Sequence, residues 1–408
     1  IGGGGSGGPI PAPGNPGTHA CGVNVALDAL DFEQVLEFIG DKDIGLTVVG
    51  PEQPLVAGIT DFLEAKGHAV FGPSTIASQL EGSKQFAKDF MARHNIPTAA
   101  YKVFSGDYYA EALAYVDAHN QYPVVLKADG LAGGKGVLIP ENREELLAGL
   151  EELRTGSLQD AAQTLVIEEF MLGEEASVFA LCDGEHFEIM GTAQDHKRQL
   201  DGDKGPNTGG MGAYSPSPLL AEDMLNSVSE TIIAPTIAGM AAEGNPYKGF
   251  LYVGLMMTSA GPKVVEYNCR FGDPECQVVI PRLRSDLLTH LVQSTRGELL
   301  GEDIVFDQQY RTTVVLVSGG YPVSYDKGFP IFGLDELEKV EAVQVFHAGT
   351  KDQDGQLCTG GGRVLNVVGT GSTLQESISM AYKGLESISF EGMFYRKDIG
   401  AKGLNHVS

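Results

Sequence analysis

Basic residues are scarce in this sequence. Its 408 residues hold 28 Lys and Arg against 54 Asp and Glu, which gives a formal net charge of −26 at pH 7. A nucleic-acid backbone requires a basic protein face, so this balance excludes a general nucleic-acid-binding role. Any anionic ligand must therefore be held by local cations and backbone amides.

Cysteines are also few, and long apolar runs are absent. The five cysteines, at positions 21, 182, 269, 276 and 358, are scattered and form no Cys-x-x-Cys pair. This pattern favours reduced thiols and argues against a zinc site. No run reaches the length of a membrane span, and the N-terminus lacks the regions of a signal peptide. We expect a cytoplasmic protein with no membrane partner.

The chain instead has the composition of an α/β globular protein of two to four domains, with 42% apolar and 20% charged residues. Residues 1–18 are rich in Gly and Pro, so no helix or strand is expected there. Strands are expected at 46–49, 69–71, 100–104, 124–127, 137–139, 164–170, 249–258, 263–268, 312–318, 343–347 and 363–368. Helices are expected at 32–39, 109–120, 141–154, 221–240, 286–296 and 373–387, with one more that starts at Ser83 as N-cap.

A glycine-rich turn between two apolar runs stands out at residues 127–136, K-A-D-G-L-A-G-G-K-G. Glycines let backbone N–H groups approach a phosphate chain closely, and Lys127 and Lys135 supply positive charge. The segment is neither a Walker loop nor a dinucleotide fingerprint, because a strand rather than a helix follows it. It predicts a phosphate-binding loop, and a hairpin turn with two solvated lysines is the alternative.

A second cluster, V-V-E-Y-N-C-R-F-G-D-P-E at residues 264–275, ends an expected strand in polar groups. Alternate residues of a strand share a face, so Glu266, Asn268 and Arg270 are expected to point the same way. Carboxylate and amide oxygens suit Mg²⁺, and a guanidinium suits phosphoryl oxygens. The pattern predicts a metal–phosphate site, with an Arg-Glu pair closing a sheet edge as the alternative.

Three further polar segments are candidate ligand-binding sites. Glu168 to Met171 lies between a strand and a turn, where backbone groups can meet an adenine edge, and Glu174 or Glu175 follows for ribose hydroxyls. The turn-like segment at 194–198, Q-D-H-K-R, mixes charges in a way that suits a zwitterionic or phosphorylated substrate. Residues 205–214 are too glycine-rich for regular structure, and such long polar loops are often functional. Each of the first two segments is equally compatible with a solvated surface turn.

Taken together, eight segments resemble the phosphoribosylamine–glycine ligase family of ATP-grasp enzymes, in the family's own order from about Ala12 to Gly400. They are G-P-E-Q-P-L-V-A-G, L-E-G-S-K-Q-F-A-K-D-F, K-A-D-G-L-A-G-G-K-G, I-E-E-F-M-L-G-E-E-A-S, Q-D-H-K-R, G-P-N-T-G-G-M-G-A-Y-S-P, E-Y-N-C-R-F-G-D-P-E and R-K-D-I-G. Their joint specificity is far above that of any single motif.

The resemblance implies a role for each matching residue. Lys84 and Lys127 would contact the ATP phosphates, beneath a flexible loop that contains Gly133, Gly134 and Lys135. Glu168, Glu169, Phe170 and Met171 would bind adenine, and Glu175 the ribose. Asp195, His196, Lys197, Gly210, Met211, Arg270 and Asp273 would bind the substrates, with Arg270 and Lys135 acting in catalysis. Glu266 and Asn268 would bind Mg²⁺ or Mn²⁺.

The resemblance also implies an architecture and a reaction. We expect a Rossmann-like doubly wound domain at 1–82, an ATP-grasp body at 83–305 with a mobile lid at about 102–173, and a small C-terminal α/β domain at 306–408. The implied reaction joins glycine to 5-phosphoribosylamine in purine biosynthesis, with ATP activating glycine as glycyl phosphate. A monomer or weak dimer is expected.

The sequence departs from the family at its start. Members open with an apolar strand, a loop resembling G-x-G-G-R-E-H-A and a helix, whereas only I-G-G-G-G-S-G-G-P-I-P stands here. Losing a central strand would open the interior of the sheet. We therefore expect the unit to be missing from this sequence rather than from the protein. A different ATP-grasp ligase, such as a carboxylating purine enzyme, and a catalytically inactive nucleotide-binding protein are the alternative functions.

Overall fold

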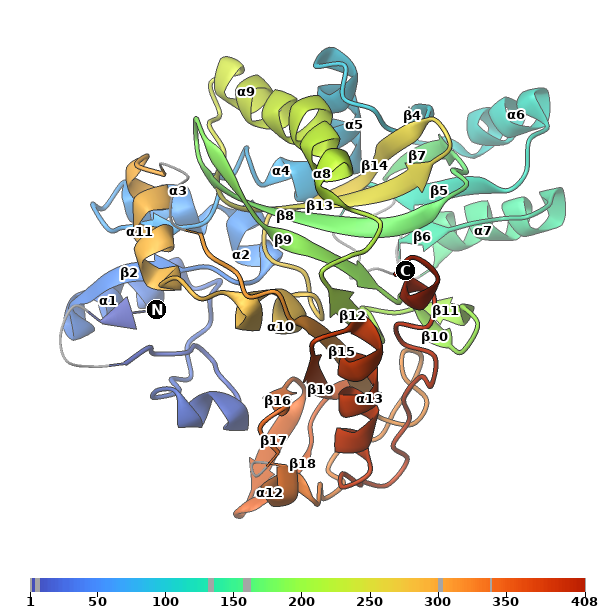
Figure 1. Ribbon diagram of the computed structural model, residues 1–408. Coiled ribbons are helices and arrows are strands. Elements are labelled where there is room, and N and C mark those ends of the chain that lie inside the picture. Colours follow the sequence, from blue (N-terminus) through green and yellow to red (C-terminus); the bar gives the residue numbers. More distant parts are fainter. Residues whose placement is uncertain are drawn as a thin grey trace.

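The protein is an α/β molecule with a large sheet and a separate smaller sheet (Figure 1). Residues of both sheets line one cavity. The computed structural model describes residues 2–3, 8–130, 136–156, 163–299, 304–337 and 340–407. The eight-stranded sheet has the order β14-β13-β8-β9-β12-β15-β19-β16, and the lid sheet has the order β4-β7-β5-β6. The α/β fold class predicted from the sequence is confirmed by this arrangement.

The N-terminal region holds a three-stranded sheet of order β1-β2-β3. Its strands are β1 (Gly2–Gly3), β2 (Ile44–Val48) and β3 (Val70–Phe71), and its helices are α1 (Phe32–Lys42), α2 (Glu52–Ala57) and α3 (Ile59–Glu64). Helix α1 begins where the Asp31 carboxylate accepts the Gln34 N–H, and it ends at Asp43 in the left-handed region, φ 49°. The parallel pair of β2 and β3 directs the carboxyl end of β2 toward Gly50, which lines the cavity.

Two helices connect this region to the lid. They are α4 (Gln79–Gly82) and α5 (Lys84–Arg93). The Ser83 hydroxyl accepts the Phe86 N–H at 3.0 Å, which confirms Ser83 as the predicted N-cap. Phe90 and Met91 give α5 a buried apolar face. This cap fixes the first turn of α5, and therefore the position of Lys84, at the cavity.

The lid consists of β4 (Tyr101–Ser105), α6 (Tyr109–His119), β5 (Val124–Ala128), β6 (Val137–Leu138), α7 (Arg143–Thr155) and β7 (Thr164–Glu169). Leu146, Leu150 and Leu153 recur at helical spacing on α7 and are fully buried against the lid sheet. Strands β5 and β6 pair antiparallel, with Leu126 opposite Leu138. The two strands predicted on either side of the glycine loop are thus confirmed, and residues 131–135 of the loop lie outside the described ranges.

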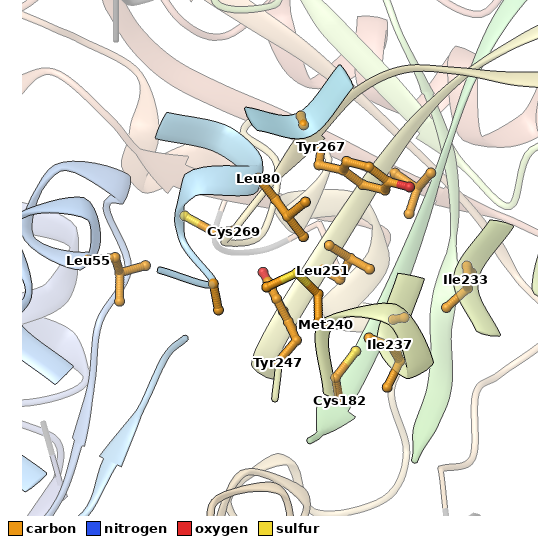
Figure 2. Packing of buried hydrophobic residues seen from close by; sticks show 14 of the residues in the cluster. Leu55, Leu80, Cys182, Ile233, Ile237, Met240, Tyr247, Leu251, Tyr267 and Cys269 are labelled. Atoms are coloured by element: carbon orange, nitrogen blue, oxygen red, sulfur yellow. The ribbon is translucent and has the colours of Figure 1, made fainter. Parts of the chain in front are cut away.

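The large sheet forms the floor of the cavity. Its strands are β8 (Glu174–Asp183), β9 (Phe187–Asp195), β12 (Gly212–Ser215), β13 (Lys248–Thr258), β14 (Gly261–Asn268), β15 (Tyr310–Val317), β16 (Val343–His347) and β19 (Arg363–Gly371). Helices α8 (Glu222–Val228) and α9 (Ala234–Ala242) flank a π-helical turn, Ser229–Ile233, within the single helix predicted over 221–240. Figure 2 shows Ile237 and Met240 of α9 packed beside Leu251 of β13, near Leu55 and Leu80 of the N-terminal helices.

The remaining elements pack at several places around this sheet. They are α10 (Cys276–Val279), α11 (Leu287–Arg296), α12 (Leu334–Leu337), β17 (Thr350–Gln353), β18 (Gln356–Thr359) and α13 (Leu374–Leu385). Pairing of β12 with β15 carries the sheet across the predicted domain boundary at 305/306 without a break. The C-terminal region therefore shares a sheet with strands β8, β9, β13 and β14.

Three predictions about irregular segments were wrong. Residues 1–18 contain β1 and a 3₁₀ helix, Pro16–Ala20, with a capping box at Asn15. Residues 205–214 contain part of β11 (Lys204–Asn207) and of β12. The predicted turn at 194–198 is limited to His196 and Lys197, because β9 extends to Asp195 and β10 (Arg198–Leu200) begins at Arg198. Ala213 pairs with both Asp195 and Thr313, so neighbouring strands impose extended structure where local composition favours loops.

Candidate active site

One cavity of about 710 Å³ lies between the N-terminal helices, the lid sheet and strands β13 and β14. Thirteen of the residues predicted to act in the site line it: Lys84, Lys127, Glu168, Glu169, Phe170, Met171, Glu175, Asp195, Lys197, Glu266, Asn268, Arg270 and Asp273. They come from segments as far apart in the sequence as Lys84 and Asp273. The fold therefore gathers nearly all the motifs at a single place.

Two predicted phosphate-binding lysines project from opposite elements. Lys84 is the first residue of α5, and its Nζ donates to the Gly130 carbonyl at 3.3 Å. Burial lowers the pKa of Lys84, because desolvation disfavours the charged amine. Lys127 stands on β5, and its Nζ donates to the Val265 carbonyl at 3.1 Å. Both amines are positioned by backbone carbonyls, which leaves each with further donors for phosphate oxygens.

A buried trio of charges lies beside them. Glu168 on β7 is 3% exposed, and its two carboxylate oxygens pair with Lys127 at 2.9 Å and Lys88 at 3.0 Å. The Lys88 amine also donates to the Thr98 hydroxyl at 2.7 Å. Burial lowers the pKa of Lys88 to about 8, although Glu168 opposes this shift. The sequence analysis did not predict Lys88. It lies one helical turn after Lys84 among buried positions of α5, and this four-residue spacing is the feature that places both lysines on one side of the helix.

The three residues after Glu168 lie along the cavity. The Glu169 carboxylate accepts the Ala100 N–H at 3.1 Å and pairs with Lys263 at 3.1 Å, so this side chain is engaged beside the strand. Phe170 and Met171 follow and line the cavity, with Phe170 37% exposed. The end of β7 therefore presents main chain and an apolar ring, which suits a flat heteroaromatic base.

Lys197 joins two of the predicted carboxylates. Its Nζ lies 3.1 Å from Glu175 and 3.5 Å from Glu266. Burial alone would raise the pKa of Glu266, but Lys197, Lys127 and Lys84 hold it below its usual value. Glu266 therefore stays ionised, as a cation ligand must.

Two further carboxyls, the half-buried Asp195 and the buried Glu275, line the cavity. Burial is the largest cause that raises the pKa of each; Glu175 and Glu266 also raise that of Asp195, and Asp195 also raises that of Glu275. Glu275 closes the motif R-F-G-D-P-E, but the sequence did not single it out. Two carboxyls in one desolvated place favour retention of a proton near neutral pH.

The end of β14 is organised by a glutamate from α4. Glu81 accepts the Arg270 guanidinium at 2.9 Å and the Cys269 N–H at 2.7 Å, and Glu52 lies 3.3 Å from Arg270. In the orientation that satisfies its hydrogen bonds, the Asn268 amide nitrogen donates to Glu81 at 2.8 Å. Glu52 and Glu81 were not predicted, because carboxylates of short helices carry no local motif for this contact.

Arg363 of β19 brings the C-terminal region to the same cavity. Its guanidinium pairs with Asp273 at 2.9 Å and donates to the Gly209 carbonyl at 2.7 Å. Gly210, with φ +114°, packs against Pro274, where a side chain would collide. The loop before β12 and the segment R-F-G-D-P-E are therefore held together across the cavity rim.

Three predicted residues lie away from the cavity lining. His196 is buried on the opposite face of the chain from Asp195 and Lys197, and Met211 is buried in the C-terminal core. Gly210 supports the rim without lining the cavity. Gly133, Gly134 and Lys135 fall outside the described residues. The alternation of strand side chains accounts for His196.

A lid sheet closing over lysines, opposite a strand that ends in carboxylate, amide and guanidinium groups, defines an ATP-grasp enzyme, an ATP-dependent ligase. The phosphoribosylglycinamide synthetase family matches the chain in three parts: the N domain at residues 10–81, the ATP-grasp (A) domain at 82–276 and the C domain at 311–402. The chain belongs to this family.

Individual relatives agree with this assignment. The phosphoribosylamine–glycine ligase of Mesorhizobium japonicum is 50% identical over 95% of this chain and 91% of its own, and that of Yersinia pestis is 49% identical over 96% and 92%. The crystal structure of the Thermotoga maritima phosphoribosylamine–glycine ligase superposes with a TM-score of 0.82 at 36% identity, covering 96% and 93% of the two chains. A Campylobacter jejuni biotin carboxylase, at 16% identity and a TM-score of 0.71, shares the fold.

In the described part of the chain, no helix combines the length and the apolar character needed to cross a bilayer.

Proposed function

We propose that this protein joins glycine to 5-phosphoribosylamine, with ATP converted to ADP and phosphate, and releases glycinamide ribonucleotide for purine biosynthesis. The observation that carries this proposal is the shared cavity of Lys84 and Lys127 with Glu266 and Asn268. Cations for a polyphosphate and oxygen ligands for a metal ion stand within one enclosed space, as phosphoryl transfer requires.

ATP is assigned to the lid side of the cavity. Lys84 and Lys127 would bind its phosphates, and Lys88 with Glu168 would hold Lys127 in place. The backbone after Glu168 would meet the adenine edge, and Glu175 would accept the ribose hydroxyls. The assignment is supported by Phe170 and Met171, which line this end of the cavity.

Glycine must be activated before it can be joined to an amine, because oxide is a very poor leaving group from a carboxylate. Transfer of the γ-phosphoryl group to the glycine carboxylate forms glycyl phosphate, and the amine of 5-phosphoribosylamine then displaces phosphate. Arg270, held by Glu52 and Glu81, would offset the charge that develops on the migrating phosphoryl group. Closure of the cavity would protect the acyl phosphate from water.

A divalent metal ion, Mg²⁺ or Mn²⁺, would be held by Glu266 and Asn268. ATP-grasp enzymes bind ATP with such an ion, which neutralises phosphate charge when bound. The donor set fits, because Glu266 is ionised and the bond from the Asn268 amide nitrogen to Glu81 leaves its oxygen free for a cation. Within the described residues no group of three His, Cys, Asp or Glu is clustered for a metal, so phosphate and water would complete the coordination.

The proposal predicts ADP release that depends on both glycine and 5-phosphoribosylamine and is unaffected by bicarbonate. A coupled assay of the full chain with ATP and Mg²⁺ measures this directly. The double variant Glu266→Gln, Asn268→Ala is the matched negative control and should remove turnover while leaving thermal stability near that of the wild type. Bicarbonate-dependent ADP release would instead identify a carboxylating ATP-grasp ligase.

Location and assembly follow from the same proposal. All five cysteines are free, and ATP is a co-substrate, which supports a cytoplasmic site of action. Glycine and 5-phosphoribosylamine are the expected partners, and a monomer or weak dimer remains the predicted assembly.

A further inference from the structure

The segment R-K-D-I-G at residues 396–400 contains a fully buried arginine that the proposed chemistry does not use. Arg396 is 0% exposed, and two of its guanidinium nitrogens donate to Asp398, both at 2.8 Å. Tyr382 donates to the Arg396 carbonyl at 2.9 Å and thereby anchors the segment on α13. A buried arginine is tolerated only when its donors are satisfied, so this geometry is closely specified.

The remaining guanidinium nitrogen, Nη1, bonds to a segment outside the C-terminal region, the hairpin of β10 and β11 at residues 198–207. Nη1 of Arg396 donates to Asp203 at 2.9 Å and to the Arg198 carbonyl at 3.0 Å. The same two segments are joined again by the Gly202 N–H, which donates to Asp398 at 2.8 Å, and by the Lys397 N–H, which donates to Asp201 at 2.8 Å. The turn of the hairpin is thus held on Arg396 and its neighbours.

Both ends of this hairpin lie at the active site. Lys197 precedes β10 and bridges Glu175 and Glu266, while Asn207 ends β11, Thr208 follows it, and both line the cavity. The Thr208 N–H donates to the Lys197 carbonyl at 2.8 Å, so the two ends are tied together. The hairpin is one rigid link between the buried arginine and Lys197.

We propose that Arg396 is a positioning residue of the active site, which fixes Lys197 and residues 207–209 through the hairpin of β10 and β11. Arginine is required because its planar fork donates to Asp398, Asp203 and a backbone carbonyl in three directions, which a lysine amine cannot reproduce. The proposal rests on the proposed function for the identity of the substrates, but not for the geometry of the link.

The test compares Arg396→Lys with Arg311→Lys in the full-length chain. Arg311 is also buried and also holds a carboxylate with two nitrogens, Asp307 at 3.0 and 2.9 Å, but it does not line the cavity. Arg396→Lys should lower kcat about tenfold or more with KM for ATP nearly unchanged, because displacement of reacting groups costs rate steeply. Arg311→Lys should lose thermal stability to a similar degree and keep kcat within about twofold.

Amide hydrogen exchange supplies a readout that needs no substrate. Exchange within residues 198–209 should become about tenfold faster in Arg396→Lys and stay unchanged in Arg311→Lys. Asp203→Asn, at a turn position, replaces a charged acceptor of Arg396 by a neutral one and leaves the arginine itself unchanged. It covers the case in which Arg396→Lys fails to fold, and it should show a smaller increase in exchange with a smaller loss of kcat.

Two results would overturn this inference. One is unchanged amide exchange within residues 198–209 in both Arg396→Lys and Asp203→Asn. The other is a kcat that falls equally in Arg396→Lys and Arg311→Lys. Absence of glycine-dependent turnover in the wild type would instead refute the proposed function. The exchange experiment would still decide whether Arg396 holds the hairpin.

Discussion

At the scale of single residues, Glu168 shows how burial decides a role. Family resemblance implies adenine binding, yet both carboxylate oxygens are occupied by Lys88 and Lys127 in a nearly dry environment. An unpaired lysine there would carry a large desolvation cost, which Glu168 offsets. We therefore expect the Glu168 side chain to hold the lysines and the backbone after it to contact adenine.

His196 is a second residue whose surroundings set its protonation. It is 5% exposed, and its Nε2 accepts the Gly400 N–H at 3.3 Å, so the neutral ring is the form that fits. Burial, with Arg396 nearby, lowers the pKa of His196 to about 4. An unfolded histidine titrates near 6.5, so between these values the unfolded chain binds the proton and the folded chain does not.

This difference predicts a specific loss of stability in acid. The contribution of His196 is fully present above about pH 6.5 and falls by roughly 1.4 kcal/mol per pH unit as pH drops toward 4. The variant His196→Gln should therefore flatten the fall of Tm between pH 6.5 and 4, measured by thermal denaturation in matched buffers. His19→Gln, at an exposed position, is the control. Equal pH dependence in wild type and His196→Gln would contradict the assignment.

At the scale of elements, the junction between the lid and α5 is a set of bonds around Asp129. Its carboxylate accepts the Gln85 N–H at 2.7 Å and the Ser83 hydroxyl at 3.1 Å, while Lys84 donates to the neighbouring Gly130 carbonyl. Strand β5, which carries Lys127, is thus fastened to the start of the helix that carries Lys84. Hydrogen bonds to a charged group each contribute about 1.5–3 kcal/mol.

We expect Asp129→Ala to raise KM for ATP about tenfold, because the bonds that fix Lys84 and Lys127 relative to one another are lost. Asp117→Ala makes the same change on the outer face of the lid, where Asp117 pairs with Arg143 at 2.8 Å, and should leave KM for ATP unchanged. Steady-state kinetics with ATP varied at saturating glycine measures both. A KM for ATP that is equal in the two variants would exclude the junction as the cause.

Most elements were predictable where one periodicity dominates. The leucines of α7 and the apolar run of β13 predicted their elements closely, because helix and strand bury their faces with different spacing. Strand β12 was missed, since Gly212 and Ala213 carry no such pattern and are extended only because β9 and β15 flank them. Local sequence cannot encode a pairing made by distant strands.

The site was predictable to the extent that its residues form contiguous motifs. Glu266, Asn268 and Arg270 stand at alternate positions of one segment, so their common place followed from strand geometry. Glu81 and Arg363 reach the cavity from α4 and β19, and no short-range pattern links either to β14. Such contacts arise from tertiary packing, which only the fold defines.

At the scale of the whole molecule, charged side chains of both signs gather in the cavity. The chain carries −26 overall, and the cavity is lined by six basic side chains, Lys84, Lys88, Lys127, Lys197, Arg270 and Arg363, together with nine acidic ones, Glu52, Glu81, Glu168, Glu169, Glu175, Asp195, Glu266, Asp273 and Glu275. The prediction that local cations hold an anionic ligand therefore rests on the placement of single lysines and arginines and not on the net charge of the cavity.

The continuous sheet unites the three regions around one reaction. Strand β14 carries the metal-binding candidates, β9 leads to Lys197 and β19 supplies Arg363, all in one eight-stranded sheet. The lid contributes Lys127 and Glu168 from a separate sheet. We therefore attribute binding of ATP to the contact between the two sheets and recognition of the acceptor to the large sheet alone.

The central claim is that ATP activates glycine as an acyl phosphate, and transfer of an oxygen label tests it most directly. With ¹⁸O in the glycine carboxylate, one labelled oxygen bridges carbon and phosphorus in glycyl phosphate and leaves with the phosphoryl group. Mass spectrometry of the inorganic phosphate released during full turnover should therefore detect one ¹⁸O per phosphate. Unlabelled phosphate during full turnover, with one labelled oxygen in the amide product and the other released elsewhere, for example into water, would contradict activation of glycine by ATP.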